Sequence, residues 1–345
     1  MKTIIVLHNP VQEDSPQDEQ DVLVQAEEVC SALETLGFRA VRLPWMLLDE
    51  TLPQKIRDSS PVCIFNLVES VLGDARLIHM APAFLDHLGI TYTGASTEAM
   101  FLTSHKVLSK RFMALNRIAT PAWFIPGYGY EADDGPVFPG TYIIKALWEE
   151  ASVGIDDNSI VRAGCIAELE NLVNIRSRQF GLPCFAEQFI DGREFNLSLL
   201  SRDGQAEVLP AAEIRFSLPP DRHNIVGYRA KWDPDSLEYQ GTRRFFDFPD
   251  SDGPLIENLR AIALRCWRVF ELRGYNRVDL RVDNSGKPYV LEINANPCIS
   301  PDSGFVAAAH RAGLGYTEII ERILHDAKPG SDCLRCGASS QAGNP

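Results

Sequence analysis

The chain has 345 residues, a length that suggests two or three domains because one domain usually takes about 100–200 residues. Its 45% hydrophobic and 23% charged residues are typical of a globular protein and argue against wholesale disorder. The formal net charge of −14 argues against a general nucleic-acid surface, although a nucleotide needs only a local pocket with a few Lys or Arg side chains and a magnesium ion.

No stretch approaches the roughly 20 apolar residues that span a bilayer, and the first residues lack the basic region, apolar run and cleavage site of a signal peptide. We therefore expect a cytoplasmic protein that binds neither membranes nor nucleic acid. The eight cysteines are scattered along the chain, which favours reduced, buried side chains in such a compartment.

The first hundred residues alternate between strand and helix patterns. An apolar run at residues 3–7 is followed by apolar residues at helical spacing between Val22 and Leu36, and Gly37 then stops the helix. Residues 38–43 and 62–67 are two further strand-like runs. This alternation predicts a parallel sheet with crossover helices up to about residue 100.

The next segment predicts a helix over residues 104–116. Thr120-Pro121 marks its end, because the residue before a proline disfavours helix. A loop rich in Gly, Pro and Asp at residues 127–140 separates it from a strand at residues 142–145.

The pattern then becomes rich in strands. Asp-Gly turns join short alternating runs, predicted as strands over residues 184–190, 194–200, 207–209 and 212–216. Residues 217–250 are irregular and polar, and loops of that length in compact domains are usually lids or binding segments.

The last part of the chain predicts a helix over residues 254–272, two strands over 276–282 and 288–294, and a helix over 316–325. The polar tail contains Cys333 and Cys336 as a lone C-x-x-C pair. A zinc site needs two further ligands, so this pair indicates either metal binding or a disordered tail.

The two late strands carry the most informative polar residues. Alternation places Arg277, Asp279 and Arg281 on one face of the first strand, and Glu292 and Asn294 on one face of the second. A hairpin would set Asp279 opposite or diagonal to Glu292. Two carboxylates and an amide oxygen are suitable ligands for magnesium, and a cation would remove the repulsion between the carboxylates. The alternative is a solvated face whose charges alternate by chance.

These motifs resemble the metal-binding end of ATP-grasp enzymes, and specifically the D-alanine–D-alanine ligase family. Further matches follow in the family's order, namely Phe65-Asn66-Leu67, residues 88–94, His105-Lys106 and Thr120-Pro121. The resemblance extends over roughly residues 1–326. It implies an ATP-grasp fold of mixed α/β and α+β class, preceded by a parallel, Rossmann-like α/β domain.

The resemblance also implies domain limits and site residues. The domains would be an N-terminal substrate domain (1–102), a central ATP-grasp subdomain (103–193), a C-terminal subdomain with the metal site and lid (194–328), and a tail (329–345). Asp279, Glu292 and Asn294 match ligands of one or two Mg²⁺ or Mn²⁺ ions. Residues that match ATP contacts are Lys106, Lys145, Ser152 of the phosphate loop, Glu187, Phe189, Glu194 and Lys231 of the lid. Arg277, Lys231 and Ser152 would assist the reaction.

Three departures from the family concern the amino-acid substrates. The N-terminal Gly-Gly…Glu pattern is missing, and either Glu13 or Glu19 is a candidate substitute. Ala151 and Trp232 replace a serine and a lid tyrosine that form a hydrogen-bonded pair in the family. Cys298 follows Pro297 where the family has glycine, although Ser300 and Ser303 remain, with Arg277, near the expected carboxylate of the second substrate.

We therefore expect an ATP- and Mg²⁺-dependent carboxylate–amine ligase that forms an acyl phosphate and then a peptide or amide bond, releasing ADP and phosphate. A true D-alanine–D-alanine ligase is one alternative, and an ATP-binding sensor without turnover is another. The expected partners are small carboxylate and amine substrates, and a homodimer is expected by analogy with the family. The short apolar helix near residues 80–88 would either mediate that contact or pack on the sheet, and we favour packing.

Overall fold

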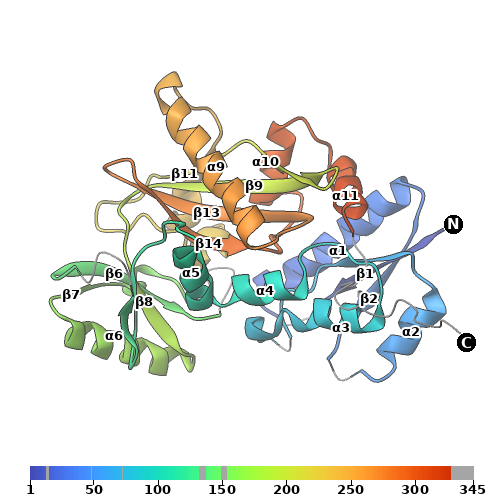
Figure 1. Ribbon diagram of the computed structural model, residues 1–345, viewed down its shortest axis with the longest axis horizontal. Helices are drawn as coiled ribbons and strands as arrows, with labels where there is room; N and C mark the ends of the chain where they lie inside the picture. The colour runs from blue at the N-terminus through green and yellow to red at the C-terminus, as the bar shows by residue number, and fades with distance from the viewer. Residues whose placement is uncertain (13–14, 48, 72, 132–136, 149–153, 328–345) are drawn as a thin grey trace, which may run out of the picture.

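The computed structural model describes residues 1–12, 15–47, 49–71, 73–131, 137–148 and 154–327, and it contains three sheets (Figure 1). None of the helices in these residues is long and apolar enough to cross a membrane. The predicted Cys333–Cys336 pair lies outside the described residues.

The N-terminal sheet is parallel, as the alternating pattern predicts. Its strand order is β2-β1-β3, and helices connect the strands. The elements of this part are β1 (Thr3–His8), α1 (Gln17–Thr35), β2 (Arg39–Pro44), α2 (Leu52–Ser59), β3 (Cys63–Asn66) and α3 (Met80–Leu88). The apolar side of α3 packs on the sheet through Ala81 and Leu85.

The helix predicted over residues 104–116 is α5 (Lys106–Leu115), and a further helix that the sequence pattern missed, α4 (Thr97–Ser104), precedes it. The backbone of His105 is extended between them, and its Nδ1 atom accepts a hydrogen bond from the Leu108 amide at 3.2 Å. His105 therefore caps a new helix, and Lys106 becomes the first residue of α5.

The central sheet has the antiparallel order β5-β4-β8-β6-β7, with α6 packed on one face. Its elements are β4 (Trp123–Ile125), β5 (Gly129–Glu131), β6 (Gly140–Ala146), β7 (Ile160–Ala163), α6 (Ile166–Phe180) and β8 (Cys184–Gln188). The sequence pattern missed α6, which is mostly polar and buries few residues, among them Leu169 and Val173.

The third sheet follows the order β12-β11-β9-β13-β14, with β10 paired to β9. Its elements are β9 (Gly192–Arg202), β10 (Gln205–Val208), β11 (Ala212–Phe216), α7 (Tyr228–Trp232), α8 (Leu237–Gly241), β12 (Thr242–Phe245), α9 (Gly253–Val269), β13 (Tyr275–Asp283), β14 (Pro288–Asn294), α10 (Gly304–Arg311) and α11 (Tyr316–His325). The segment predicted as irregular, residues 217–250, thus contains two short helices and an edge strand.

Apolar clusters join these parts rather than staying within them. The α9 face of the third sheet packs with Ala99 and Met100 of α4. The helices α10 and α11 bury Phe305 and Ile320 in the same cluster as Val29 of α1. The C-terminal helices therefore lie against the N-terminal helix (Figure 1). The predicted boundaries at residues 102 and 193 stay predictions.

One glycine is critical where these parts meet. Gly274 adopts a φ of +67°, and a Cβ atom there would lie 3.2 Å from backbone atoms of Gly94. Its amide donates a 2.6 Å hydrogen bond to the buried carboxylate of Asp326. Both the backbone conformation and the close approach therefore require glycine.

We expect Gly274→Ala to lower the free energy of unfolding more than Gly89→Ala does. Gly89 has almost the same φ, +65°, but a Cβ atom there meets nothing within 4 Å. The backbone conformation alone costs about 1–2 kcal/mol, and overpacking adds about 1–3 kcal/mol at Gly274. Urea unfolding of both variants measures the difference, and equal losses would contradict the proposed role of the Gly94 contact.

Candidate functional site

The predicted carboxylate pair lies on neighbouring strands. Asp279 of β13 is directly opposite Glu292 of β14, and Arg277 is opposite Asn294. A register shift follows immediately, between Asp279 and Leu280. Because directly opposed residues point to the same face of a sheet, both carboxylates share one face, as the sequence predicts.

Asp279 is held by a guanidinium and an amide. Arg277 donates from Nε to Oδ1 at 2.7 Å and from Nη2 to Oδ2 at 2.8 Å. Asn196 donates from Nδ2 to Oδ1 at 2.7 Å, from the neighbouring strand β9. Burial disfavours the Arg277 cation, but the adjacent Asp279 carboxylate raises the pKa of Arg277 above its usual value, so Arg277 remains a cation.

Glu292 lies among cations from three other elements. Lys106 donates from Nζ to Oε2 at 3.1 Å, and the Glu292 side chain remains 37% exposed. The field of Lys106 holds the pKa of Glu292 well below its usual value, against the effect of burial, and Lys231 and Lys145 act in the same direction. Glu292 is therefore ionised at neutral pH.

Lys231 is partly buried on α7. Burial lowers its pKa, and so does the positive charge of Arg277, whereas Glu292 and Asp279 raise it. The sequence-predicted residues Lys106, Lys231, Arg277, Asp279 and Glu292 are thus brought into one electrostatic environment from α5, α7, β13 and β14.

Glu187 is buried between two lysines. Lys145 of β6 donates to its Oε1 atom at 2.8 Å, and Lys110 of α5 forms a close ion pair with its Oε2 atom. The Glu187 and Lys110 side chains are only 2% and 1% exposed. Burial lowers the pKa of Lys110 to about 8, although Glu187 opposes the shift.

Sequence reasoning missed Lys110 and Asn196. Lys110 stands one helical turn after Lys106, which is a signal that the sequence did contain, because residues at this spacing lie on one helix face. Asn196 is recognisable only from the pairing of β9 with β13.

Phe189 and Glu194 lie beside another side chain that the sequence reasoning did not assign. Arg281 is 3% exposed, forms a 2.8 Å ion pair with Glu194, and lies with its guanidinium carbon 5.1 Å from the centre of the Phe189 ring. Arg281 shares the face of β13 that carries Arg277 and Asp279, because residues two apart point the same way.

The two serines predicted to meet a substrate carboxylate already have intramolecular roles. Ser300 donates to Asp21 of α1 at 2.7 Å, and the Cys298 thiol donates to the same carboxylate at 3.0 Å. Ser303 caps α10 by accepting from the Val306 amide at 3.2 Å. Of the two candidate glutamates, Glu19 is exposed and Glu13 lies outside the described residues.

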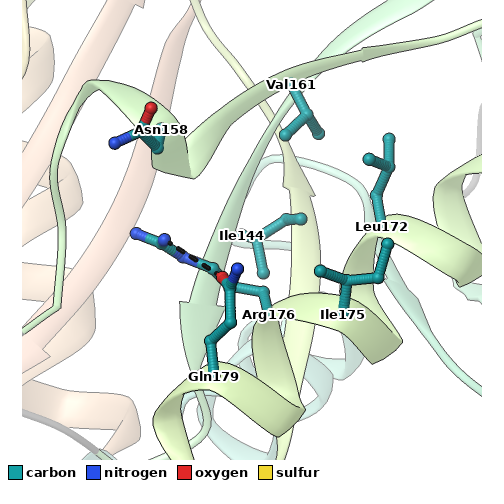
Figure 2. Close-up of a pocket in the computed structure, with 7 residues that line it drawn as sticks. All are labelled: Ile144, Asn158, Val161, Leu172, Ile175, Arg176 and Gln179. Carbon is teal, nitrogen blue, oxygen red and sulfur yellow. Dashed lines mark hydrogen bonds between the residues drawn. The ribbon is translucent and has the colours of Figure 1, made fainter.

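Ser152 also lies outside the described residues, but the end of its loop is described. Arg176 of α6 donates to the carbonyl of Gly154 at 3.2 Å and to Asp156 at 2.6 Å, and packs over Phe180. Arg176 lines a cavity of about 310 Å³ beside α6. Figure 2 shows the side chains that surround this cavity. Ile144 lines this cavity, so it lies on the opposite face of β6 from Lys145 and outside the candidate site.

The donor set fits a magnesium ion. Asp279 and Glu292 provide hard oxygen atoms at opposed positions, and Asn294 adds an amide oxygen that accepts from the Asn296 amide at 3.0 Å. Among the described residues, no group of three or more His, Cys, Asp or Glu side chains forms a metal cluster.

Comparisons with known proteins agree on one family. The model of the family described as "D-ala D-ala ligase C-terminus" matches residues 138–325. A D-alanine–D-alanine ligase of Synechococcus sp. (strain JA-3-3Ab) is 30% identical over 338 residues, 95% of each chain. An uncharacterized protein, y4sG, of Sinorhizobium fredii is 34% identical and covers 76% of this chain and 73% of its own.

The fold is also shared with solved structures. The structure titled as D-alanine–D-alanine ligase from Bacillus anthracis complexed with ATP has a TM-score of 0.69 and 20% sequence identity, and the match covers 94% of this chain and 97% of that one.

We expect Glu187→Gln to destabilise the protein by about 3–5 kcal/mol at pH 7, because it leaves the buried Lys110 and Lys145 without their anion. The pKa of Glu187 in the folded state lies below the ordinary 4.5, mainly because the two ammonium groups outweigh burial. Its stabilising effect is therefore complete above about pH 4.5 and is lost as the pH falls toward the folded-state pKa.

Urea unfolding at pH 7, 5 and 4 measures the free energy of unfolding of wild type and Glu187→Gln. The difference between the two free energies should be constant down to pH 5 and smaller at pH 4. Glu257→Gln is the control, because Glu257 is 78% exposed in its ion pair. A wild-type advantage that stays constant to pH 4 would argue against this charge assignment.

Proposed function

Because the chain belongs to the D-alanine–D-alanine ligase family and is an ATP-dependent ligase with the ATP-grasp fold, we propose that it joins a small carboxylate to an amine, with a substrate pair other than two D-alanine molecules. The observation that carries this proposal is the opposed Asp279–Glu292 pair, surrounded by Lys106, Lys231 and Arg277. We propose amino acids as the substrates, with ADP and phosphate as co-products of the new amide bond.

The cationic side chains are suited to phosphoryl transfer. This reaction depends mainly on positioning and on neutralising phosphate charge, which lysines and an arginine supply. Lys106 and Lys145 reach into the site from α5 and β6, and Lys231 belongs to the segment proposed as the lid. Mg²⁺, when bound by Asp279, Glu292 and Asn294, would supply further neutralisation of phosphate oxygens.

We propose that Arg277 steadies the reacting carboxylate. Its guanidinium is held in a fixed plane by Asp279, which leaves its direction well defined. We propose that it orients the acyl phosphate and the tetrahedral state that forms when the amine attacks the acyl carbon. This state gives the amide when the nitrogen loses a proton to solvent and phosphate leaves.

The altered substrate pair is supported by three positions. Ser300 donates to the Asp21 carboxylate, so a substrate carboxylate would meet a negative charge beside this serine. Cys298 adds a thiol to the same group. Trp232 brings an indole to the end of α7, and its Nε1 atom is buried without a hydrogen-bond partner among the described residues. These contacts differ from a pocket built around a serine–tyrosine pair.

We expect Asp279→Asn and Glu292→Gln each to lower the rate of ADP formation by at least about 100-fold, because each removes a negative oxygen from the magnesium set. Asp283→Asn is the matched control on the same strand, since Asp283 bonds only within the following turn to Ser285 and Lys287 in the described structure. Full activity of Asp279→Asn and Glu292→Gln would contradict the assignment.

The substrates are best identified by measuring ADP release with ATP, Mg²⁺ and pools of D-amino, L-amino and hydroxy acids. We expect D-alanine alone to give less than about a tenth of the best rate, since a changed pocket typically discriminates by one or more orders of magnitude. A fastest rate with D-alanine alone would identify a true D-alanine–D-alanine ligase. ATP binding without stimulation by any acid would favour the sensor alternative.

A further inference from the structure

Arg281 is a buried arginine on the functional face of β13. Its side chain is only 4% exposed, and its residue partners come from three separate segments. Two N–H groups, at Nε and Nη2, donate to Glu194 Oε2 of β9 at 3.1 and 2.8 Å. The Nη1 atom donates to the carbonyl of Ile190, between β8 and β9, at 2.8 Å, and Nη2 also contacts the carbonyl of Asn224.

These acceptors require the forked shape of arginine. A guanidinium presents five N–H donors in one plane, whereas an ammonium group is a single point with three donors on a flexible stem. Burying a cation at this depth is costly unless it is paired and hydrogen-bonded, so the contacts to Glu194, Ile190 and Asn224 fix the position of Arg281 closely.

The segment before α7 is attached at the same place. The ring of His223 lies 6.1 Å from that of Phe189, and the His223 amide donates to Asp157 at 3.2 Å. Arg222 is paired with the Asp157 carboxylate as well. The chain between β11 and α7 therefore lies over Phe189, and Arg281 lies on the same ring.

We propose that Arg281 is a positioning residue for the adenosine half of the nucleotide. This inference rests on the proposed function and on the family resemblance, which implies that Phe189 and Glu194 belong to the segment that holds the adenine and ribose. Arg281 sets the direction of the Glu194 carboxylate, supports the Phe189 ring, and ties the Asn224 carbonyl of the lid segment to the Ile190 carbonyl. One side chain thus aligns the surface that receives the nucleoside with the segment that covers it.

The proposal predicts different effects on binding of the nucleoside and on binding of the phosphates. Lys106 and Lys145, proposed for the phosphates, form ion pairs with Glu292 and Glu187, whereas Arg281 forms its ion pair with Glu194. Loss of Arg281 should therefore weaken the binding of adenosine much more than the binding of inorganic triphosphate. A general destabilisation of the fold would weaken the binding of both.

The test measures the dissociation constants of ATP, adenosine and inorganic triphosphate by calorimetry for wild type and Arg281→Met. We expect adenosine to bind at least about tenfold more weakly to the variant, since charged hydrogen bonds typically contribute that much. Triphosphate binding should stay within about twofold. In turnover, KM for ATP should rise while kcat stays within about threefold, as for loss of uniform binding.

Two further variants keep the test decisive. Arg281→Lys retains a positive charge beside Glu194, so this variant is expected to fold even if Arg281→Met does not. It should still weaken the binding of adenosine, because lysine lacks the planar guanidinium group. Arg193→Met is the matched control, because Arg193 forms ion pairs with Glu213 of β11 and with Asp252, which directly precedes α9, and its side chain points to the opposite face of β9 from Glu194.

Normal adenosine affinity in Arg281→Lys and Arg281→Met, or equal losses of adenosine and triphosphate affinity, would contradict the proposed role of Arg281. Neither result would contradict the proposed function. Wild-type protein that binds neither ATP nor adenosine would instead overturn the proposed function, and this role with it.

Discussion

The pairing of β13 with β14 places two carboxylates side by side, and the rest of the site is arranged to tolerate them. Asp279 and Glu292 would repel each other at directly opposed positions. Arg277 and Asn196 hold the first, while Lys106 and the fields of Lys231 and Lys145 stabilise the second. The helices α5 and α7 and two sheets therefore meet at this pair, which links the arrangement of the parts to the chemistry of the site.

The same region concentrates positive charge in an acidic protein with a net charge of −14. Four lysines and two arginines face four carboxylates there, and the unbalanced charge is evident at Lys231, whose pKa is lowered by burial and by Arg277. A bound anion would relieve this repulsion. Phosphate groups are suited to this environment, whereas the overall acidity of the protein would oppose extended nucleic acid.

Substrate selection is expected to depend on a different set of contacts from those that hold the nucleotide. Asp21 of α1 accepts hydrogen bonds from Ser300 and Cys298, and the amide of Gln25 bridges Asp21 and Glu69. These residues join the N-terminal helix to the segment after β14. The N-terminal part is therefore physically connected to the proposed acyl-transfer region, although the family's glycine-rich N-terminal pattern is missing.

The sequence by itself determined the features that depend on local pattern. The alternation of side chains placed Asp279 on the same face of its strand as Arg277, and Glu292 on the same face of its strand as Asn294. Apolar runs predicted the parallel strands β1 and β3, and an ordered set of motifs indicated the family. Only the tertiary structure decided which distant groups meet. Nothing local shows that Asn196 bonds Asp279, that Lys110 pairs with Glu187, that Asp21 accepts from Ser300, or that Arg281 joins four segments. These contacts depend on strand order and on helix packing across the chain, and a pattern of neighbouring residues does not contain that information.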